Sequence, residues 1–384
     1  MPRRVVIAGA SARALAESAH RLGIEVYAAD LFGDRDLLAA AKNWYLAMPY
    51  PEALPDLVDR FPPAAWIYTG ALENHPEIIA AISQRRPLAG SSPQSLALVR
   101  HPDLLARMVE DAGLLVPETR CSPHGLATDG SWLLKPQASA GGHGIRRWFG
   151  WQEGDQTSNR WVWQRFIPGQ PWSAAFLIRS GSHRLIGVSR QLIGCSWCHA
   201  KPFSWSGGVD LAPETLSPSR LALLDRLGDV LGMACGLTGL IGVDFVVDRC
   251  GRGHIIEVNP RPTASMELIE RSTGLSLVAA QLTGCGDNSP SAKPIYSRQE
   301  IWSKAVLFTP RSLRFDDHAA EVVASLRNPW TAADGWPAVA DVPMPTQTIA
   351  AGRPVCTIFA RGQSAPDSLR TLIRRTTALS AAVC

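Results

Sequence analysis

Short apolar runs near the start of the chain alternate with segments that read as helices. The runs at residues 4–8 (RVVIA), 24–29 (IEVYAA) and 66–70 (WIYTG) are typical of buried strands. Helices are expected between the first two runs, ending near His20, and over 76–84. Strands that alternate with helices predict a parallel sheet with helices packed on its faces.

Three loops follow the carboxyl ends of these strands, where the ligands of such sheets bind. They span residues 11–13, 30–36 and 70–74, and we expect them to face a cleft. Arg13 and Glu73 lie in these loops and read equally well as cleft residues or as solvated helix ends. The first turn (GASAR) lacks the G-x-G-x-x-G pattern, so no nicotinamide site is expected there.

The rest of the chain mixes strand-like and helical patterns. Helices are expected over 93–113 and 217–236, and the segment 284–294, rich in Gly, Asp, Asn, Ser and Pro, reads as a linker. Short strands and a final amphipathic helix near 365–380 follow it. The fold class is therefore α/β and α+β. We expect three parts, which span residues 1–95, 96–283 and 284–384.

The composition excludes several classes of protein. Hydrophobic residues make up 46% and charged residues 19% of the 384 residues, which excludes global disorder. The net charge of +4 is too small to indicate a nucleic-acid partner, and no apolar run reaches the ~18 residues of a membrane span. The N-terminus lacks the apolar stretch of a signal peptide, so we expect a cytoplasmic protein whose eight cysteines are reduced.

One of only five lysines stands directly before a glycine-rich loop. Lys135 lies in the strand-like run WLLKP, and residues 139–144 read SAGGHG. Glycine lets backbone N–H groups wrap anionic oxygens, and a nearby lysine adds positive charge for the same phosphates. The lysine precedes the glycines and no G-K-[ST] occurs, so this is not a Walker A loop. The pattern indicates a phosphate site, with a plain glycine-rich hairpin as the alternative.

Oxygen ligands gather in a second motif, a predicted β-hairpin over 240–262. Glu257 and Asn259 share one face of their strand because side chains alternate along it. Together with Asp244 they offer the hard oxygen ligands that Mg²⁺ prefers. Arg261 follows, and its guanidinium can clamp a developing anion. The alternative is a plain hairpin with polar edges, although a charged residue in an apolar strand is costly unless it is paired.

In this order, the motifs resemble the ATP-grasp superfamily. They are Lys135 with its glycine loop, residues 163–169 (WQRFIPG), and the stretch from D-F at Asp244 to E-V-N-P-R at Arg261. The resemblance covers roughly residues 1–282. It implies a Rossmann-like pre-ATP-grasp domain, then an ATP-grasp fold whose two subdomains enclose ATP, and a small β-rich C-terminal domain.

The resemblance also implies where ATP and the metal bind. Arg261 and Lys135 would be catalytic, with Arg261 stabilising an acyl phosphate and the oxyanion formed from it. Asp244, Glu257 and Asn259 would hold one or two Mg²⁺. Backbone groups of the Gln164 segment would contact adenine, and Lys201 reads equally well as a phosphate contact or as a solvated loop residue. The nucleotide-binding set is Arg100, Lys135, Ser139, Gly141, Gly142, Gly144, Gln164, Arg165, Phe166, Ile167 and Lys201.

The activity implied is that of a carboxylate–amine ligase. Such enzymes use ATP to make an acyl phosphate, release ADP and pass the acyl group to an amine, so the partners are a small acid and a small amine. A homodimer is also compatible with the resemblance. An ATP-dependent carboxylase would carry an acidic base a few residues after the arginine. Ser265 stands near that place and Glu267 is out of register, which disfavours bicarbonate. A degenerate, regulatory nucleotide-binding module is the other alternative, and the intact set of motif residues disfavours it.

A narrower resemblance involves three phrases, at residues 9–19, 30–34 and 354–360. They look like an ATP-grasp group associated with methanopterin-linked one-carbon metabolism. That likeness implies a role in assembling a cofactor of the tetrahydromethanopterin or methanofuran type. The reaction would join glutamate to an amine or pterin-like acceptor.

One further motif, C-x-x-C-H at Cys195, Cys198 and His199, formally matches a haem-attachment sequence. Haem attachment of this kind takes place outside the cytosol, and no export signal is seen. A zinc site would need further ligands, and no second C-x-x-C occurs. We expect a chance cluster in a loop.

Overall fold

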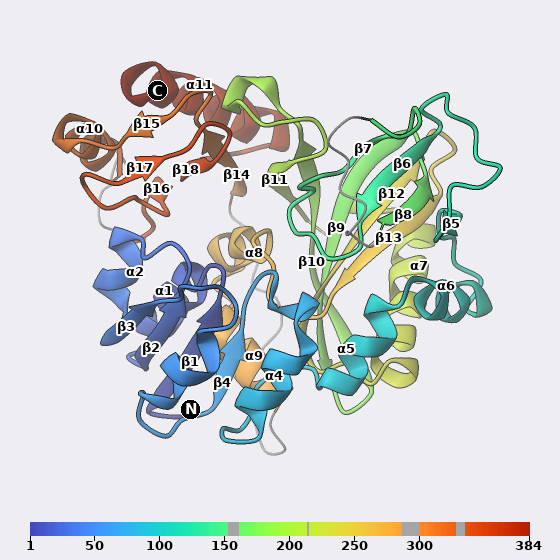
Figure 1. Ribbon diagram of the computed structural model, residues 1–384, viewed down its shortest axis with the longest axis horizontal. Helices are drawn as coiled ribbons and strands as arrows, with labels where there is room; N and C mark the ends of the chain where they lie inside the picture. The colour runs from blue at the N-terminus through green and yellow to red at the C-terminus, as the bar shows by residue number, and fades with distance from the viewer. Residues whose placement is uncertain (153–160, 213–214, 286–299, 328–334) are drawn as a thin grey trace.

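Four parallel strands form the N-terminal sheet of the computed structural model, which describes residues 1–152, 161–212, 215–285, 300–327 and 335–384 (Figure 1). The strand order is β3-β2-β1-β4, so the three predicted strands are confirmed and β3 lies at the edge. The elements are β1 (Arg4–Gly9), α1 (Arg13–Arg21), β2 (Glu25–Asp30), α2 (Arg35–Ala40), β3 (Asn43–Leu46), α3 (Leu54–Asp59), β4 (Trp66–Tyr68), the 3₁₀ turn η1 (Leu72–Asn74) and α4 (Pro76–Ser83).

Both faces of this sheet are buried, as expected for parallel strands. Val5, Ile7 and Val26 on one face pack with α1 and with residues of the central part of the chain such as Leu277. Val6 and the other face pack with α3 and α4. The N-terminal sheet is therefore held against the rest of the molecule by a shared apolar core.

The single helix predicted over 93–113 is wrong, because the structure has two. α5 (Pro93–Arg100) and α6 (Pro102–Asp111) are separated at His101, whose φ and ψ of −89° and 111° are extended. Proline disfavours helical geometry in the residue before it, so Pro102 ends the first helix. The break leaves Arg100 at the end of α5, where its side chain reaches the candidate site.

A small antiparallel sheet of order β5-β8-β6-β7 carries the lysine strand (Figure 1). Trp132, Trp148 and Trp163 form its core, and the last two rings meet edge to face with centroids 5.5 Å apart. Its register pairs Lys135 with Val162 on β8. The strands are β5 (Thr119–Arg120), β6 (Trp132–Pro136), β7 (Arg146–Arg147) and β8 (Trp161–Arg165).

An eight-stranded antiparallel sheet forms the centre of the molecule and runs into the C-terminal part. Its order is β13-β12-β9-β10-β11-β14-β18-β16, and β11 pairs directly with β14, so no break in the sheet separates the C-terminal strands (Figure 1). The predicted hairpin is confirmed as β12–β13. The strands are β9 (Gly169–Arg179), β10 (Ser182–Ile193), β11 (Trp205–Leu211), β12 (Gly239–Asp248), β13 (Gly253–Asn259), β14 (Ile301–Phe308), β16 (Val339–Ala340) and β18 (Pro354–Gly362).

The helix predicted over 217–236 continues from an α-helix into a π-helical turn, and the final helix is confirmed as α11. Most of the predicted linker at 284–294 lies outside the described residues. Among the described helices, none combines the length and apolar character needed to cross a membrane. The remaining elements are η2 (Ser196–Cys198), α7 (Pro218–Asp229), η4 (Val230–Ala234), α8 (Met266–Thr273), α9 (Leu277–Gly284), β15 (Leu313–Arg314), α10 (Asp317–Arg327), β17 (Thr348–Ile349) and α11 (Ala365–Val383).

The loops at 11–13 and 30–36 do not open into a cleft as predicted. Arg13 is 2% and Asp36 3% exposed. The Arg13 guanidinium donates to both oxygens of Asp341, at 2.8 and 3.2 Å, and forms ion pairs with Glu267 and Glu17. These hydrogen bonds and ion pairs join the N-terminal sheet, α8 and the C-terminal part.

Candidate active site

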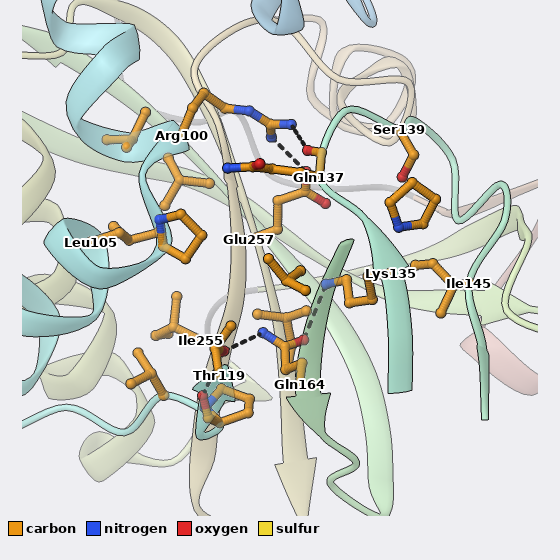
Figure 2. A pocket seen from close by; sticks show the side chains of 18 of the residues that line it. Arg100, Leu105, Thr119, Lys135, Gln137, Ser139, Ile145, Gln164, Ile255 and Glu257 are labelled. Atoms are coloured by element: carbon orange, nitrogen blue, oxygen red, sulfur yellow. Dashed lines mark hydrogen bonds and ion pairs between the residues drawn. The ribbon is translucent and has the colours of Figure 1, made fainter. Parts of the chain in front are cut away.

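A pocket lies where the end of α5, strand β6, its glycine loop and strand β13 meet (Figure 2). A row of polar side chains crosses it, with Arg100 and Glu257 at one end and Lys135 and Gln164 at the other, as Figure 2 shows. A pocket with apolar walls and a few placed polar groups is typical of a small-molecule site. Its apolar walls include Val99, Leu105, Val116, Ile145, Val162 and Ile255.

Lys135 points into the pocket from β6. Its ammonium donates to Gln164 Oε1 at 3.1 Å, and the Gln164 amide donates to the hydroxyl of Thr119 at 3.4 Å (Figure 2). Burial lowers the pKa of Lys135, while the charge of Glu257 acts in the opposite direction. The pairing of β6 with β8 places Lys135 and Gln164 together, and Thr119 is a lining residue that the sequence did not suggest.

The glycine loop closes one side of the pocket. Ser139, Gly141 and Gly142 line it, whereas Gly144 does not and packs on Pro136 instead. Gly142 has a φ of +79°, and a Cβ there would lie 2.0 Å from the carbonyl oxygen of Phe203. Only glycine therefore fits this close backbone contact.

Arg100 connects three segments of the chain. Its guanidinium donates to Glu257 at 2.8 Å and to the Gln137 carbonyl oxygen at 3.4 Å, and it also donates to Asn74 Oδ1. The predicted phosphate-contacting arginine thus lies in the pocket, where a carboxylate partly neutralises it in this structure. Asn74 was missed by the sequence reasoning, although it lies in a loop that was expected to face a cleft.

Asp244 and Glu257 are direct cross-strand neighbours on β12 and β13. Asp244 accepts from Gln191 Nε2 at 2.7 Å and from Asn259 Nδ2 at 3.2 Å. Burial, and after it the like charge of Glu257, raises the pKa of Asp244 to about 6. Two carboxylates this close favour a cation between them. Within the described ranges, no group of three or more His, Cys, Asp or Glu side chains is placed to hold a metal.

Arg261 lies beyond the end of β13 and forms an ion pair with Glu73 at 2.8 Å. The two side chains are only 12% and 3% exposed, so Glu73 is not a solvated helix end. Arg261 Nε and Glu73 Oε2 are buried and have no hydrogen-bond partner among the described residues. Nearby, the Tyr68 hydroxyl donates to the Pro260 carbonyl oxygen at 2.6 Å, which pins the turn that carries Arg261.

Several predicted nucleotide contacts do not line the pocket. Of the segment 164–167, only Gln164 does. The N–H of Arg165 donates to the Glu118 carbonyl oxygen at 2.7 Å, and that of Phe166 to the Ser131 carbonyl oxygen at 3.0 Å. Arg165, Phe166 and Ile167 lie outside the lining. Lys201 is exposed and lies beside Gly352, also away from the pocket.

Two other sequence features have structural roles. Glu267, the acidic residue out of register with a carboxylase base, is 2% exposed and paired with Arg13 and Lys304. Cys198 Sγ lies 3.2 Å from the Cys195 carbonyl oxygen, and all eight cysteines are free thiols. The structure thus gives the C-x-x-C-H sequence no disulfide.

Comparison with known proteins agrees with the resemblance found in the sequence. Residues 104–265 match the family described as ATP-grasp domain. The L-amino acid ligase of Bacillus licheniformis is 15% identical, with 98% of this chain and 97% of that chain covered and a TM-score of 0.72. The biotin carboxylase domain of the Hydrogenobacter thermophilus 2-oxoglutarate carboxylase, a dimer in complex with MgADP and bicarbonate, is 14% identical over 94% of this chain and 86% of that one, with a TM-score of 0.69.

A curated relative is the carbamoyl phosphate synthase large chain of Micrococcus luteus, which is 24% identical over 223 residues. The match covers 53% of this chain, and the chain spans only 19% of that relative's length. An N5-carboxyaminoimidazole ribonucleotide synthetase in its ADP complex is 15% identical over 98% of this chain and 96% of that chain, with a TM-score of 0.69.

The family match makes residues 104–265 an ATP-grasp domain. The arrangement of the whole chain is shared with the ligase and synthetase structures above. The resemblance of the sequence to the ATP-grasp superfamily is therefore confirmed over residues 104–265.

Proposed function

We propose that this protein is an ATP-dependent, ADP-forming ligase that joins a small carboxylic acid to an amine through an acyl phosphate. The observation that carries the proposal is the meeting of Lys135, Arg100 and Glu257 in one pocket, with Arg261 directly beyond it. Cationic side chains, together with a carboxylate that can hold a metal ion, stabilise the charge that develops in phosphoryl transfer. The ATP-grasp family match supports the same chemistry.

The nucleotide would lie along the row of polar groups. The apolar walls suit an adenine ring, and Gln164 lines the same pocket and could read the edge of that ring. Lys135, Arg100 and the N–H groups of the glycine loop at 139–142 would bind the phosphates. In this arrangement the Arg100–Glu257 ion pair opens when the ligands bind, because each partner gains a charge of opposite sign from the nucleotide or the metal.

Magnesium would be held by Asp244, Glu257 and Asn259. The residues fit the ion, since two carboxylates of like charge lie across from each other, and burial together with the charge of Glu257 raises the pKa of Asp244 to about 6. When bound, Mg²⁺ supplies neutralisation of charge on the terminal phosphates. We propose one or two such ions.

Arg261 would act on the acyl group. The carboxylate oxygen of the acid attacks the γ-phosphorus and ADP leaves. The amine nitrogen then attacks the acyl carbon, and phosphate leaves as the amide forms. The Arg261 guanidinium can hold the oxygen on which charge develops. Glu73 orients that guanidinium through the 2.8 Å ion pair.

A carboxylase is the second reading, and the surroundings of Arg261 disfavour it. Ser265 and Glu267 are the residues nearest the place of an acidic base, and both are buried. Glu267 is already paired with Arg13 and Lys304. No free base for bicarbonate is therefore found among the described residues in this stretch.

The test is the release of ADP and phosphate from MgATP with a panel of acids and amines. We expect release that depends on one acid and one amine, and a loss of at least about a hundredfold in Lys135→Met. Lys42→Met is the matched control, since Lys42 is exposed and pairs with Glu25 at the surface. Incorporation of labelled bicarbonate would favour the carboxylase instead, and tight MgATP binding with no turnover on the whole panel would favour a regulatory module.

The metal site predicts a pH dependence. Because the pKa of Asp244 is raised to about 6, protons compete with Mg²⁺ as the pH falls below that value. We expect the affinity for Mg²⁺ in the presence of ADP to fall by about tenfold per pH unit below pH 6 and to be flat above pH 7. Calorimetric titration of Asp244→Asn with Mg²⁺ should show weak binding whose affinity no longer falls below pH 6. Asp225→Asn, at an exposed residue of α7, should keep the wild-type profile, and an identical profile in Asp244→Asn would contradict the assignment.

We further propose that the acid or the amine belongs to one-carbon cofactor assembly, of the tetrahydromethanopterin or methanofuran type. The support is the likeness of the three sequence phrases, of which the first and the last meet in space. Arg13 and Thr357 both donate to the carboxylate of Asp341. Including glutamate and pterin-like amines in the panel tests this substrate assignment. Light scattering tests whether the protein is a homodimer.

A further inference from the structure

Asn74 lies at the end of the N-terminal sheet, where it reaches into the candidate site of the central part. It is the last residue of η1, the turn that follows β4. Ala71 begins this turn with a φ of 69°, a left-handed geometry that is uncommon outside glycine. The turn places two consecutive side chains on two arginines, because Glu73 pairs with Arg261 and Asn74 bonds to Arg100.

The Asn74 amide bonds in two directions. Its Oδ1 accepts from the Arg100 guanidinium, and its Nδ2 donates to the carbonyl oxygen of Ser139 at 3.3 Å. Arg100 in turn donates to the Gln137 carbonyl oxygen at 3.4 Å. The Asn74 side chain, from the turn after β4, therefore contacts both the start of the glycine loop and Arg100.

The glycine loop needs such anchors. Gly141, Gly142 and Gly144 all have positive φ, and glycine has more conformational freedom to lose than any other residue. On its far side the loop is held where the N–H of Trp205 donates to the Gly141 carbonyl oxygen at 2.9 Å. Asn74 supplies the matching anchor at residue 139. Groups fixed in advance cost less ordering entropy when a ligand binds.

We propose that Asn74 is a positioning residue that arranges Arg100 and the glycine loop for the phosphates of the nucleotide. The inference rests on the proposed nucleotide site and adds to it a part of the N-terminal sheet. It makes nucleotide affinity depend on contacts from the η1 turn, which lies outside the ATP-grasp match at residues 104–265.

Two substitutions separate the two bonds of Asn74. Asn74→Asp keeps an acceptor for Arg100 but loses the donor to the Ser139 carbonyl oxygen, whereas Asn74→Ala loses both. Asn43→Ala is the matched control, since Asn43 is exposed on β3 and its side-chain oxygen accepts from the neighbouring N–H of Trp44. The full-length chain is used throughout, with thermal melting to verify that each variant folds.

The first readout is binding of MgADP and of adenosine by calorimetry. We expect Asn74→Ala to lower the affinity for MgADP by about tenfold or more, which is the effect of losing a hydrogen bond to a charged group. The affinity for adenosine should stay within about twofold of the wild type. Asn74→Asp should lie between it and the wild type. A purely structural role would weaken both ligands alike. Unchanged MgADP affinity in Asn74→Ala, or an equal loss for adenosine, overturns the proposal.

The second readout is hydrogen exchange of the loop in the ligand-free protein. Amides of residues 139–142 should exchange faster in Asn74→Asp and Asn74→Ala than in the wild type or Asn43→Ala. This result does not require any ligand, so it remains informative if the wild type fails to bind MgADP, an outcome that would reject the proposed function. Equal exchange rates in all four proteins would overturn the anchoring role itself.

Discussion

Replacing Arg13 with methionine is expected to lower the free energy of unfolding by about 3 to 5 kcal/mol. The methionine keeps much of the apolar stem but removes the charge that faces Glu267 and Asp341. Glu267, which is 2% exposed, and Asp341, which is 26% exposed, each lose a charged partner, and a buried carboxylate with fewer partners is costly. Denaturant unfolding followed by tryptophan fluorescence measures the change.

The loss should depend on pH. Burial alone would raise the pKa of Glu267, but the charges of Arg13, Lys304 and Arg271 hold it well below its usual range. A carboxyl with a lowered folded pKa stabilises the protein above its unfolded pKa and loses that contribution as the pH falls through the folded value. Without Arg13 the pKa of Glu267 rises, so the carboxyl can be protonated. The destabilisation should therefore be larger at pH 7 than at pH 4.5.

Arg85→Met is the matched control for this experiment. Arg85 is 52% exposed and pairs with Asp59 at the surface, where an ion pair contributes about 0 to 1 kcal/mol. A loss of similar size in both variants, or an Arg13→Met protein as stable as the wild type, would contradict the role assigned to the buried network.

The sequence predicted best those features that depend on neighbours along the chain. The hairpin of β12 and β13 follows from two alternating runs joined by glycines, and its register brings Asp244 opposite Glu257. The lysine strand and its loop are equally local. Alternation and glycine content are properties of short windows, so no knowledge of the rest of the fold is needed.

Contacts between distant segments could not be predicted in this way. Arg13 meets Glu267 and Asp341 across more than 250 positions of sequence, and nothing in residues 11–13 indicates a buried partner. The loops were therefore assigned to an open cleft by the rule for parallel sheets, whereas packing of α8 and the C-terminal strands covers them. Asn74 was missed for the same reason, because its partners lie in α5 and in the glycine loop.

Some errors had a signal in the sequence. Pro102 should have divided the helix at 93–113, since the residue before a proline avoids helical geometry. The segment 164–167 was treated as one adenine-binding unit, although β8 ends at Arg165 and only Gln164 of the segment lines the pocket. For Lys201 the solvated reading, left open from the sequence, fits its exposure.

Replacing Arg261 with lysine is expected to lower kcat by about a hundredfold to a thousandfold, for the acid and amine that the panel identifies. Lysine keeps the positive charge but not the planar fork that binds two oxygens at once, so the change is not conservative here. Arg261 lies beyond the nucleotide pocket, whose lining does not include it. The affinity for MgADP should therefore stay within about threefold of the wild type. Steady-state kinetics and calorimetry on the same preparation separate the two effects.

Two further variants make the result specific. Arg252→Lys is the matched control, because Arg252 is 63% exposed at the far end of the same hairpin and pairs with Asp248. Glu73→Gln removes the carboxylate that orients Arg261 and leaves an amide of the same shape, so it should lower kcat by a smaller factor, about tenfold. If Arg261→Lys weakened MgADP as much as it lowered kcat, Arg261 would be a nucleotide-binding residue. If neither kcat nor the MgADP affinity changed, the reacting carboxyl would have to lie elsewhere. The ion pair of Arg261 with Glu73 would then be a structural contact between η1 and the end of β13.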